Sequence, residues 1–176
     1  MEQIKNNNSK QKKFTTGLFI VYFLVLTWMV LFKMSFSFQD LHRLRSINLI
    51  PYHASGIANG RIDMREIIYN IIGFIPFGIY ICMIKDNWSI LKKIISIAGV
   101  SLSYEVLQYV FAVGGSDITD LIGNTLGGII GIVIYFLISK LFKSNQKMNK
   151  VLNIIALILT ILIISFVTFI ILTNLQ

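Results

Sequence analysis

The sequence predicts an all-α integral membrane protein with about five transmembrane helices, and two observations carry that prediction. Hydrophobic residues make up 55% of the 176 residues and charged residues only 14%, with a mean hydropathy of +0.73. A soluble domain carries about 25% charged residues. The apolar residues also gather into runs of roughly 18 or more, a length that spans a bilayer as a helix. These runs and their short connections leave no room for a separate soluble domain.

Five apolar runs define the predicted helices in chain order, over residues 14–32, 67–84, 94–113, 118–138 and 151–172. Residues 1–13 form a basic cytoplasmic tail that we expect to be disordered. No small-residue cleavage site follows the first run, which we therefore interpret as a retained helix rather than a signal peptide. Residues 14–142 are assigned to one membrane domain and 151–173 to an additional C-terminal transmembrane helix. Pro76 lacks an amide donor and predicts a kink or a local break in the second helix.

The longest polar connection joins the first two runs over residues 33–66. Its apolar residues Leu41, Leu44 and Ile47 have the spacing of a short amphipathic helix that lies at the membrane interface. Pro51 ends any such helix, and turns containing glycine follow before the second run. We therefore predict an amphipathic interfacial segment in the first outer loop.

Lysine and arginine are distributed unevenly over the two predicted sides of the membrane. With the N-terminus inside, the cytoplasmic segments hold eleven of these residues and the outer segments hold five. The positive-inside rule therefore predicts an N-in/C-out orientation. The net charge of +8 is spread in short clusters beside the apolar runs, which indicates contact with membrane lipids and argues against nucleic acid as a partner.

Six polar side chains interrupt the apolar runs near their predicted outer ends. They are Asn70 on the second run, Glu105 and Gln108 on the third, and Asp117, Asp120 and Asn124 on the fourth. A charge at a helix centre costs roughly 2.5–3.5 kcal/mol or more, so the buried Glu105 needs a partner or a use. The short turn between the third and fourth runs makes them antiparallel neighbours. The six side chains then form one cavity that opens in the outer leaflet.

Each of these residues also has a structural interpretation. Asp117 or Ser116 can cap the fourth helix, and Asp120 can interact with its dipole. Gln108 and Asn124 can form interhelical hydrogen bonds, and Asn70 can be a helix cap. The polar stripe of the fourth run continues into Gly127, Gly128 and Gly131, which allow a neighbouring backbone to approach closely.

Four arginines lie on the side that the positive-inside rule disfavours, namely Arg43, Arg45, Arg61 and Arg65. Such residues ordinarily bind lipid headgroups. A sharper hypothesis is that Arg61 or Arg65 folds down to pair with Glu105 or Asp120.

No metal site and no other cofactor is predicted. Cys82 is the only cysteine, which excludes an intramolecular disulfide and a cysteine-based metal site. His42 and His53 are isolated in one loop without the spacing of zinc ligands.

Four short motifs follow one another over roughly residues 45–138. They are Asn48-Leu49-Ile50-Pro51-Tyr52, Asn70 with Gly73-Phe74-Ile75-Pro76-Phe77-Gly78, Glu105-x-x-Gln108, and Asp117-x-x-Asp120 with Asn124-x-x-Gly127 and Gly131. In this order they resemble the VanZ-like family, membrane proteins named for one associated with low-level teicoplanin resistance. Gly114-Gly115 stands where many relatives carry an arginine, so a role for that arginine is not carried over. The resemblance implies a multi-pass protein of the bacterial cytoplasmic membrane and glycopeptide tolerance, but it supplies no reaction.

Three functions remain open from the sequence. The favoured one is non-enzymatic binding of an amphiphile in the outer-leaflet cavity, either a lipoglycopeptide antibiotic or a lipid-linked cell-wall precursor. The second is a membrane enzyme that acts on a lipid-linked substrate, with Glu105 as acid or base and Asp117 or Asp120 holding a divalent cation. The third is a proton-coupled transporter using Glu105, against which the lack of an internal repeat argues.

Overall fold

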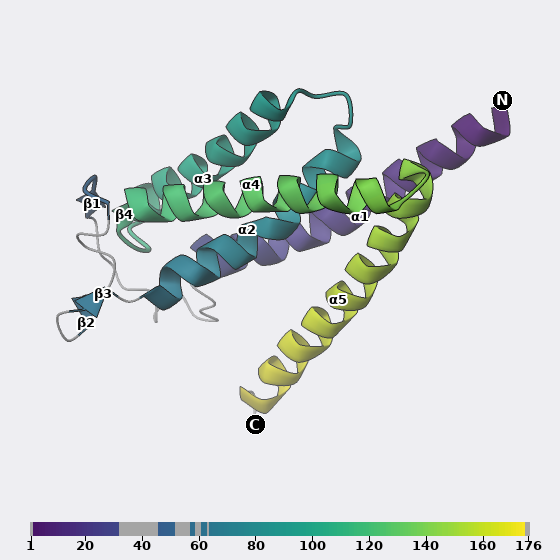
Figure 1. Cartoon of the computed structure of the whole chain (residues 1–176). Coiled ribbons are helices and arrows are strands. Elements are labelled where there is room, and N and C mark those ends of the chain that lie inside the picture. Colours follow the sequence, from purple (N-terminus) through teal and green to yellow (C-terminus); the bar gives the residue numbers. More distant parts are fainter. Residues whose placement is uncertain (1, 32–45, 52–56, 59–60, 63, 175–176) are drawn as a thin grey trace.

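The computed structural model describes residues 2–31, 46–51, 57–58, 61–62 and 64–174, and its architecture is helical (Figure 1). The helices are α1 (Glu2–Leu31), α2 (Met64–Ile84), α3 (Ile90–Phe111), α4 (Ile118–Leu141) and α5 (Asn145–Asn174). All five are long and apolar enough to cross a membrane. The predicted all-α class with five transmembrane helices is therefore confirmed, and each helix contains or nearly contains its predicted apolar run.

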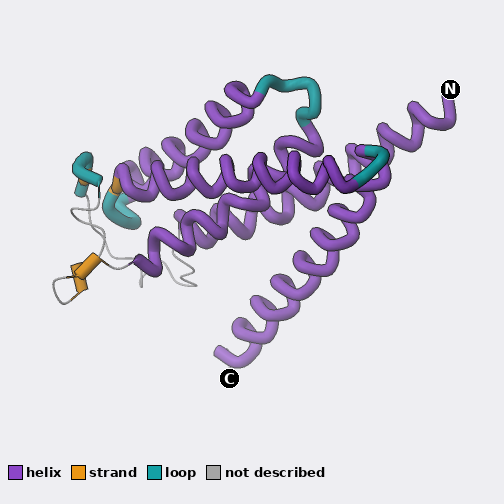
Figure 2. Tube along the Cα trace, viewed as in Figure 1, coloured by secondary structure: helices purple, strands orange, loops and turns teal. Residues whose placement is uncertain are grey.

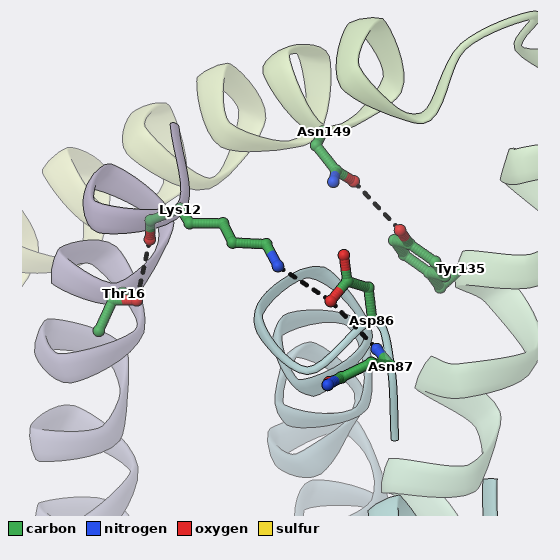
Figure 3. A network of polar contacts seen from close by, with 6 residues as sticks. All are labelled: Lys12, Thr16, Asp86, Asn87, Tyr135 and Asn149. Carbon is green, nitrogen blue, oxygen red and sulfur yellow. Dashed lines mark hydrogen bonds and ion pairs between the residues drawn. The ribbon is translucent and has the colours of Figure 1, made fainter. Parts of the chain in front are cut away.

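α1 begins at Glu2, so our expectation of a disordered tail over residues 1–13 was wrong. Polar contacts hold this part of the helix against the rest of the protein. Lys12 forms an ion pair with Asp86 at 2.9 Å (Figure 3), and Gln11 donates to the carbonyl of Gln146 at 3.0 Å. The hydrogen bond from Lys12 lowers the pKa of the Asp86 carboxyl below its ordinary value.

One end of the bundle collects the start of α1, the α2–α3 loop, the end of α4 and the start of α5. The Lys12–Asp86 pair lies there beside the hydrogen bond from the Tyr135 hydroxyl to Asn149, at 3.3 Å (Figure 3). The lysines that we assign to the cytoplasmic side flank these segments. The arrangement is the one that an N-in/C-out protein requires, and the orientation itself stays a prediction.

α2 is helical throughout its length and shows no break at Pro76. A proline removes one amide donor from the preceding turn of a helix. In that turn the hydroxyl of Tyr22 on α1 donates to the carbonyl of Gly73 at 2.6 Å. This bond connects α1 to α2 at the residue after Ile72, whose carbonyl is the one that loses its donor to Pro76.

α2 and α4 pack backbone to backbone through glycines of α4. Gly123, Gly127 and Gly131 recur every four residues and face Ile67, Ile71 and Ile75 of α2, respectively. A Cβ atom at Gly127 or Gly131 would overlap a carbonyl oxygen of α2. A Cβ atom at Gly123 would lie 3.8 Å from the carbonyl oxygen of Ile67, an ordinary contact distance. The predicted close approach is therefore observed, and the two helices diverge toward their first turns.

The four strands contain two residues each and lie at one end of the bundle (Figure 2). β1 (Ile47–Asn48) pairs in parallel with β4 (Ser116–Asp117), and β2 (Ile57–Ala58) pairs in antiparallel orientation with β3 (Arg61–Ile62). The β1–β4 pair attaches part of the long first loop to the turn between α3 and α4.

The amphipathic interfacial helix predicted from Leu41, Leu44 and Ile47 falls mostly outside the described residues. Its one described member, Ile47, lies in β1, so a helix does not include that residue. Ile47 is bound to the α3–α4 turn by strand pairing, a contact that local spacing does not reveal.

α5 packs on α1 near its first turns and then diverges from the other helices (Figure 1). Thr15 of α1 and Asn153 of α5 exchange side-chain hydrogen bonds of 3.0 and 2.9 Å at this contact. Farther along, the apolar surface of α5 is not buried inside the protein. Lipid therefore has access to most of this helix.

The glycine contact predicts a graded response along one face of α4. Replacing Gly127 or Gly131 by alanine is expected to destabilise the fold by about 1–3 kcal/mol, because the added methyl overlaps a backbone oxygen of α2. Gly123→Ala is the matched control on the same face, where the methyl has room. Thermal unfolding of the purified variants in detergent measures the difference. Equal stability of all three variants would contradict the proposed contact.

Candidate functional site

Glu105 connects α3 to the start of α4. The residue is only 5% exposed, and its Oε2 atom accepts a hydrogen bond from the amide of Asp117 at 2.8 Å. Its own carbonyl oxygen accepts a hydrogen bond from the hydroxyl of Ser116 at 2.6 Å. The carboxylate thus lies at the amino-terminal end of α4, where the helix dipole stabilises an anion. The α3–α4 turn is therefore a partner for this buried charge.

Asp117 is the N-cap of α4, which is the structural role considered for it in the sequence analysis. Its Oδ1 atom accepts hydrogen bonds from the amide of Thr119 at 2.8 Å and from the side chain of Asn48 at 3.1 Å. In a capping box the side chain at position N3 accepts the hydrogen bond of the N-cap amide. Position N3 is Asp120 here, but Glu105 supplies that acceptor from α3.

Asp120 instead forms a polar link between α4 and α2. Its Oδ1 atom accepts a hydrogen bond from the side-chain amide of Asn70 at 2.8 Å. Both residues line a cavity of about 490 Å³, which we name the polar cavity. Its other polar lining residues are Arg65, Glu66, Tyr69 and Gln108, and its apolar ones are Leu26, Met29, Val30, Ile72, Gly73 and Phe74. Four helices, α1 to α4, therefore contribute to its walls.

Gln108 and Asn124 are almost completely buried and connect α3 to its neighbours. Gln108 Nε2 donates to the carbonyl of Val30 on α1 at 2.9 Å, and Asn124 Nδ2 donates to the hydroxyl of Ser101 at 2.9 Å. The interhelical hydrogen bonds that we considered for these two residues are therefore present. Within the described part of the chain, neither amide oxygen has a hydrogen-bond partner.

The single cavity predicted from the sequence is divided in two. Glu105 and Asp117 line a separate cavity of about 230 Å³ together with Asn48 and Ser116. Asn70, Gln108, Asp120 and Arg65 share the polar cavity, while Asn124 lines neither of the two. The physical reason is that Glu105 faces the α3–α4 turn, whereas Gln108 faces α1.

The outer-loop arginines are only partly described. Arg65 lies in the first turn of α2 and lines the polar cavity together with Asp120. The backbone of Arg61 lies in β3, but its side chain and the residues 43 and 45 are outside the described part of the chain. The pairing of one of these arginines with a buried carboxylate stays a prediction.

Three residues of this region were not among the predicted site residues. Asn48 bonds to Asp117, Ser116 bonds to the carbonyl of Glu105, and Ser101 bonds to Asn124. Asn48 was visible only as a part of the motif around Pro51. A serine in an apolar helix gives no signal that distinguishes an interhelical donor or acceptor from a residue that bonds its own helix.

The described residues contain no group of three or more His, Cys, Asp or Glu side chains placed to hold a metal ion. His42 and His53 lie outside the described residues. In the smaller cavity, Glu105 accepts a hydrogen bond from the amide of Asp117, and Asp117 accepts one from the amide of Thr119. Both carboxylates therefore stabilise the start of α4.

Two substitutions of Glu105 distinguish the contribution of its hydrogen bond to stability from the contribution of its charge. Glu105→Gln retains an oxygen that can accept the amide of Asp117, so its stability should stay close to that of the wild type. Glu105→Leu leaves that partly buried amide without an acceptor, which costs up to about 1–3 kcal/mol. Thermal unfolding in detergent tests this difference. If both variants are equally destabilised, the charge and not the hydrogen bond is what α4 requires.

Comparisons with known proteins identify the family of this chain. The model of the VanZ/LLP1 family matches residues 19–143, a range that contains the carboxylates that line the two cavities. A protein named VanZ from Enterococcus faecium is 37% identical over 140 residues, which cover 78% of this chain and 80% of that protein. No solved structure matches the chain. The resemblance suggested by the four motifs is confirmed, and the chain belongs to the VanZ/LLP1 family.

Proposed function

We propose that this VanZ-like protein contributes to glycopeptide resistance, against teicoplanin in particular, by binding an amphiphile in the polar cavity. Membership of the VanZ/LLP1 family supports the link to resistance. The mixed polar and apolar lining of the polar cavity supports the binding of an amphiphile. In the predicted orientation the cavity faces the outer leaflet, where a lipoglycopeptide and its lipid-linked targets meet.

The observation that carries the proposal is the meeting of polar and apolar walls in one cavity. Asp120 and Asn70 line it together with apolar residues such as Leu26, Met29 and Phe74. Binding sites for small molecules are mostly apolar, with a few polar groups that orient the ligand. An amphiphile has the same division, with a polar headgroup on one side and a hydrocarbon chain on the other.

Two ligands with this chemistry lead to the same outcome. Sequestering the acylated antibiotic lowers the amount of drug that reaches its target. Binding a lipid-linked cell-wall precursor shields that target from the drug. Sequestration acts on the acylated teicoplanin more strongly than on vancomycin, which has no acyl chain, whereas shielding of the precursor would lower the effect of both drugs.

The enzymatic alternative depends on other residues. Glu105 and Asp117 share the smaller cavity, and a proton transfer there would use the Glu105 carboxyl, whose Oε2 atom accepts the amide of Asp117. A binding function depends on Asp120 in the polar cavity, whereas a proton transfer depends on Glu105. The two functions therefore predict different sensitive residues.

The proposal is tested by teicoplanin and vancomycin sensitivity in a susceptible Gram-positive host that expresses equal amounts of each variant. Wild type is expected to protect against teicoplanin more than against vancomycin. Asp120→Asn should lose most of the protection, because it retains the acceptor for Asn70 but removes the charge from the cavity. Glu105→Gln should retain protection, because its amide oxygen can replace the acceptor for Asp117.

Asp86→Asn is the matched control, since it neutralises an aspartate at the opposite end of the bundle. Loss of protection in Glu105→Gln with full protection by Asp120→Asn would favour the enzymatic alternative. Full protection by both variants would contradict a role for either cavity.

A further inference from the structure

Lys93 is a buried lysine at the start of α3. The residue is only 3% exposed, whereas its neighbour Lys92 in the same turn is exposed. The Lys93 ammonium lies over the ring of Phe136 on α4, 5.9 Å from the ring centroid. On α2 it interacts electrostatically with Cys82, a thiol that is largely uncharged at neutral pH. Lys93 therefore differs from the exposed lysines that flank the apolar runs.

The described residues offer this ammonium no counter-charge. Buried charges are ordinarily paired, because an unpaired charge loses its hydration without compensation. Asp86 is the only carboxylate that the structure describes at this end of the bundle, and its Oδ1 atom is paired with Lys12 at 2.9 Å (Figure 3). The ring of Phe136 attracts a cation but carries no negative charge. A bound anion is therefore the partner that the site favours.

The surroundings of Lys93 also favour an anion. The residue lies at the amino-terminal end of a 22-residue helix, where the helix dipole attracts negative charge and repels a lysine. On α4, Lys140 follows Phe136 by four residues and shares its face, one turn nearer the end of the helix. The Lys93 nitrogen is not closed to water, so a ligand at the surface can reach it.

The depth of Lys93 indicates the class of anion. Lys93 lies three residues from the start of α3, and Phe136 lies five residues from the end of α4. These spacings correspond to about 4.5 and 7.5 Å along the two helices. In the predicted orientation both helix ends are at the cytoplasmic face, where the phosphates of inner-leaflet lipids lie. A lysine side chain at this depth extends to the headgroup region.

We propose that Lys93 is the centre of a binding site for the phosphate of an anionic phospholipid in the cytoplasmic leaflet. Lys140 supplies a second cation from α4, and the dipole of α3 adds to the attraction. The bound phosphate then connects the start of α3 to the end of α4. The site goes beyond the proposed function and does not depend on it, because Lys93, Phe136 and Lys140 do not line the polar cavity.

Native mass spectrometry of the full chain in detergent tests the site with two lipids that have the same acyl chains. One is phosphatidylglycerol, which is anionic, and the other is phosphatidylcholine, whose headgroup carries its own cation beside the phosphate. The wild type is expected to bind phosphatidylglycerol more tightly than phosphatidylcholine.

Two lysine variants of the same turn separate this site from general surface charge. Lys93→Met removes the buried charge and retains a long side chain. It is expected to weaken phosphatidylglycerol binding about fivefold, equivalent to the roughly 1 kcal/mol that one lysine contributes at an anionic lipid surface. Lys92→Met is the matched control, because it removes the same charge from an exposed position. This control should retain most of the binding.

Thermal unfolding without added lipid distinguishes a lipid site from a structural role of Lys93. Replacing an unpaired buried charge by an apolar side chain of similar size does not destabilise a protein. Lys93→Met is therefore expected to match or exceed the unfolding temperature of the wild type. If it unfolds at a lower temperature and binds phosphatidylglycerol like the wild type, Lys93 is a structural contact and the proposal fails.

Two further results would overturn the assignment. Equal losses of phosphatidylglycerol binding in Lys93→Met and Lys92→Met would indicate general attraction by surface charge. Displacement of the lipid by an equal concentration of inorganic phosphate would assign the site to a soluble anion instead of a lipid.

Discussion

The backbone contact between α2 and α4 is the constraint on which the candidate site depends. At Gly127 and Gly131 any side chain would overlap the backbone of α2, so only glycine permits this separation of the helices. The contact loosens at Gly123, one turn nearer the start of α4. Asn70 and Asp120 occupy this wider end and bond to each other at 2.8 Å. Packing in the apolar part of the helices thus contributes to the position of the polar pair.

A second constraint assigns different tasks to carboxylates that lie close together in the sequence. The start of α4 needs acceptors for its free amides. Asp117 accepts one from within its own turn, and Glu105 accepts another from α3. Asp120 occupies the N3 position of the helix but bonds to Asn70 across the helix interface. Glu105, which lies deep in its apolar run, therefore accepts a hydrogen bond from the α3–α4 turn. Asp120, in the first turn of α4, lines the polar cavity instead.

Local sequence determines some of these features and not others. Apolar runs of sufficient length predicted the five helices, and the spacing of Gly127 and Gly131 predicted a close neighbour. Contacts between distant segments were not predictable in this way: Lys12 meets Asp86 74 positions away, and Asn48 meets Asp117 69 positions away. These contacts connect the start of α1 and the first loop to segments that are distant in the sequence. The division into two cavities arises because Glu105 of α3 faces the α3–α4 turn and Gln108 faces α1. The sequence of α3 alone does not show which neighbour each of its faces contacts.

The proposed role of Asp120 in binding an amphiphile can be measured by native mass spectrometry of the purified protein, after incubation with teicoplanin and, separately, with lipid extracted from a Gram-positive membrane. We expect a stoichiometric adduct with teicoplanin or with one lipid class, present in wild type and Asp86→Asn and strongly reduced in Asp120→Asn. Equal adducts in all three proteins, or none in wild type, would contradict it.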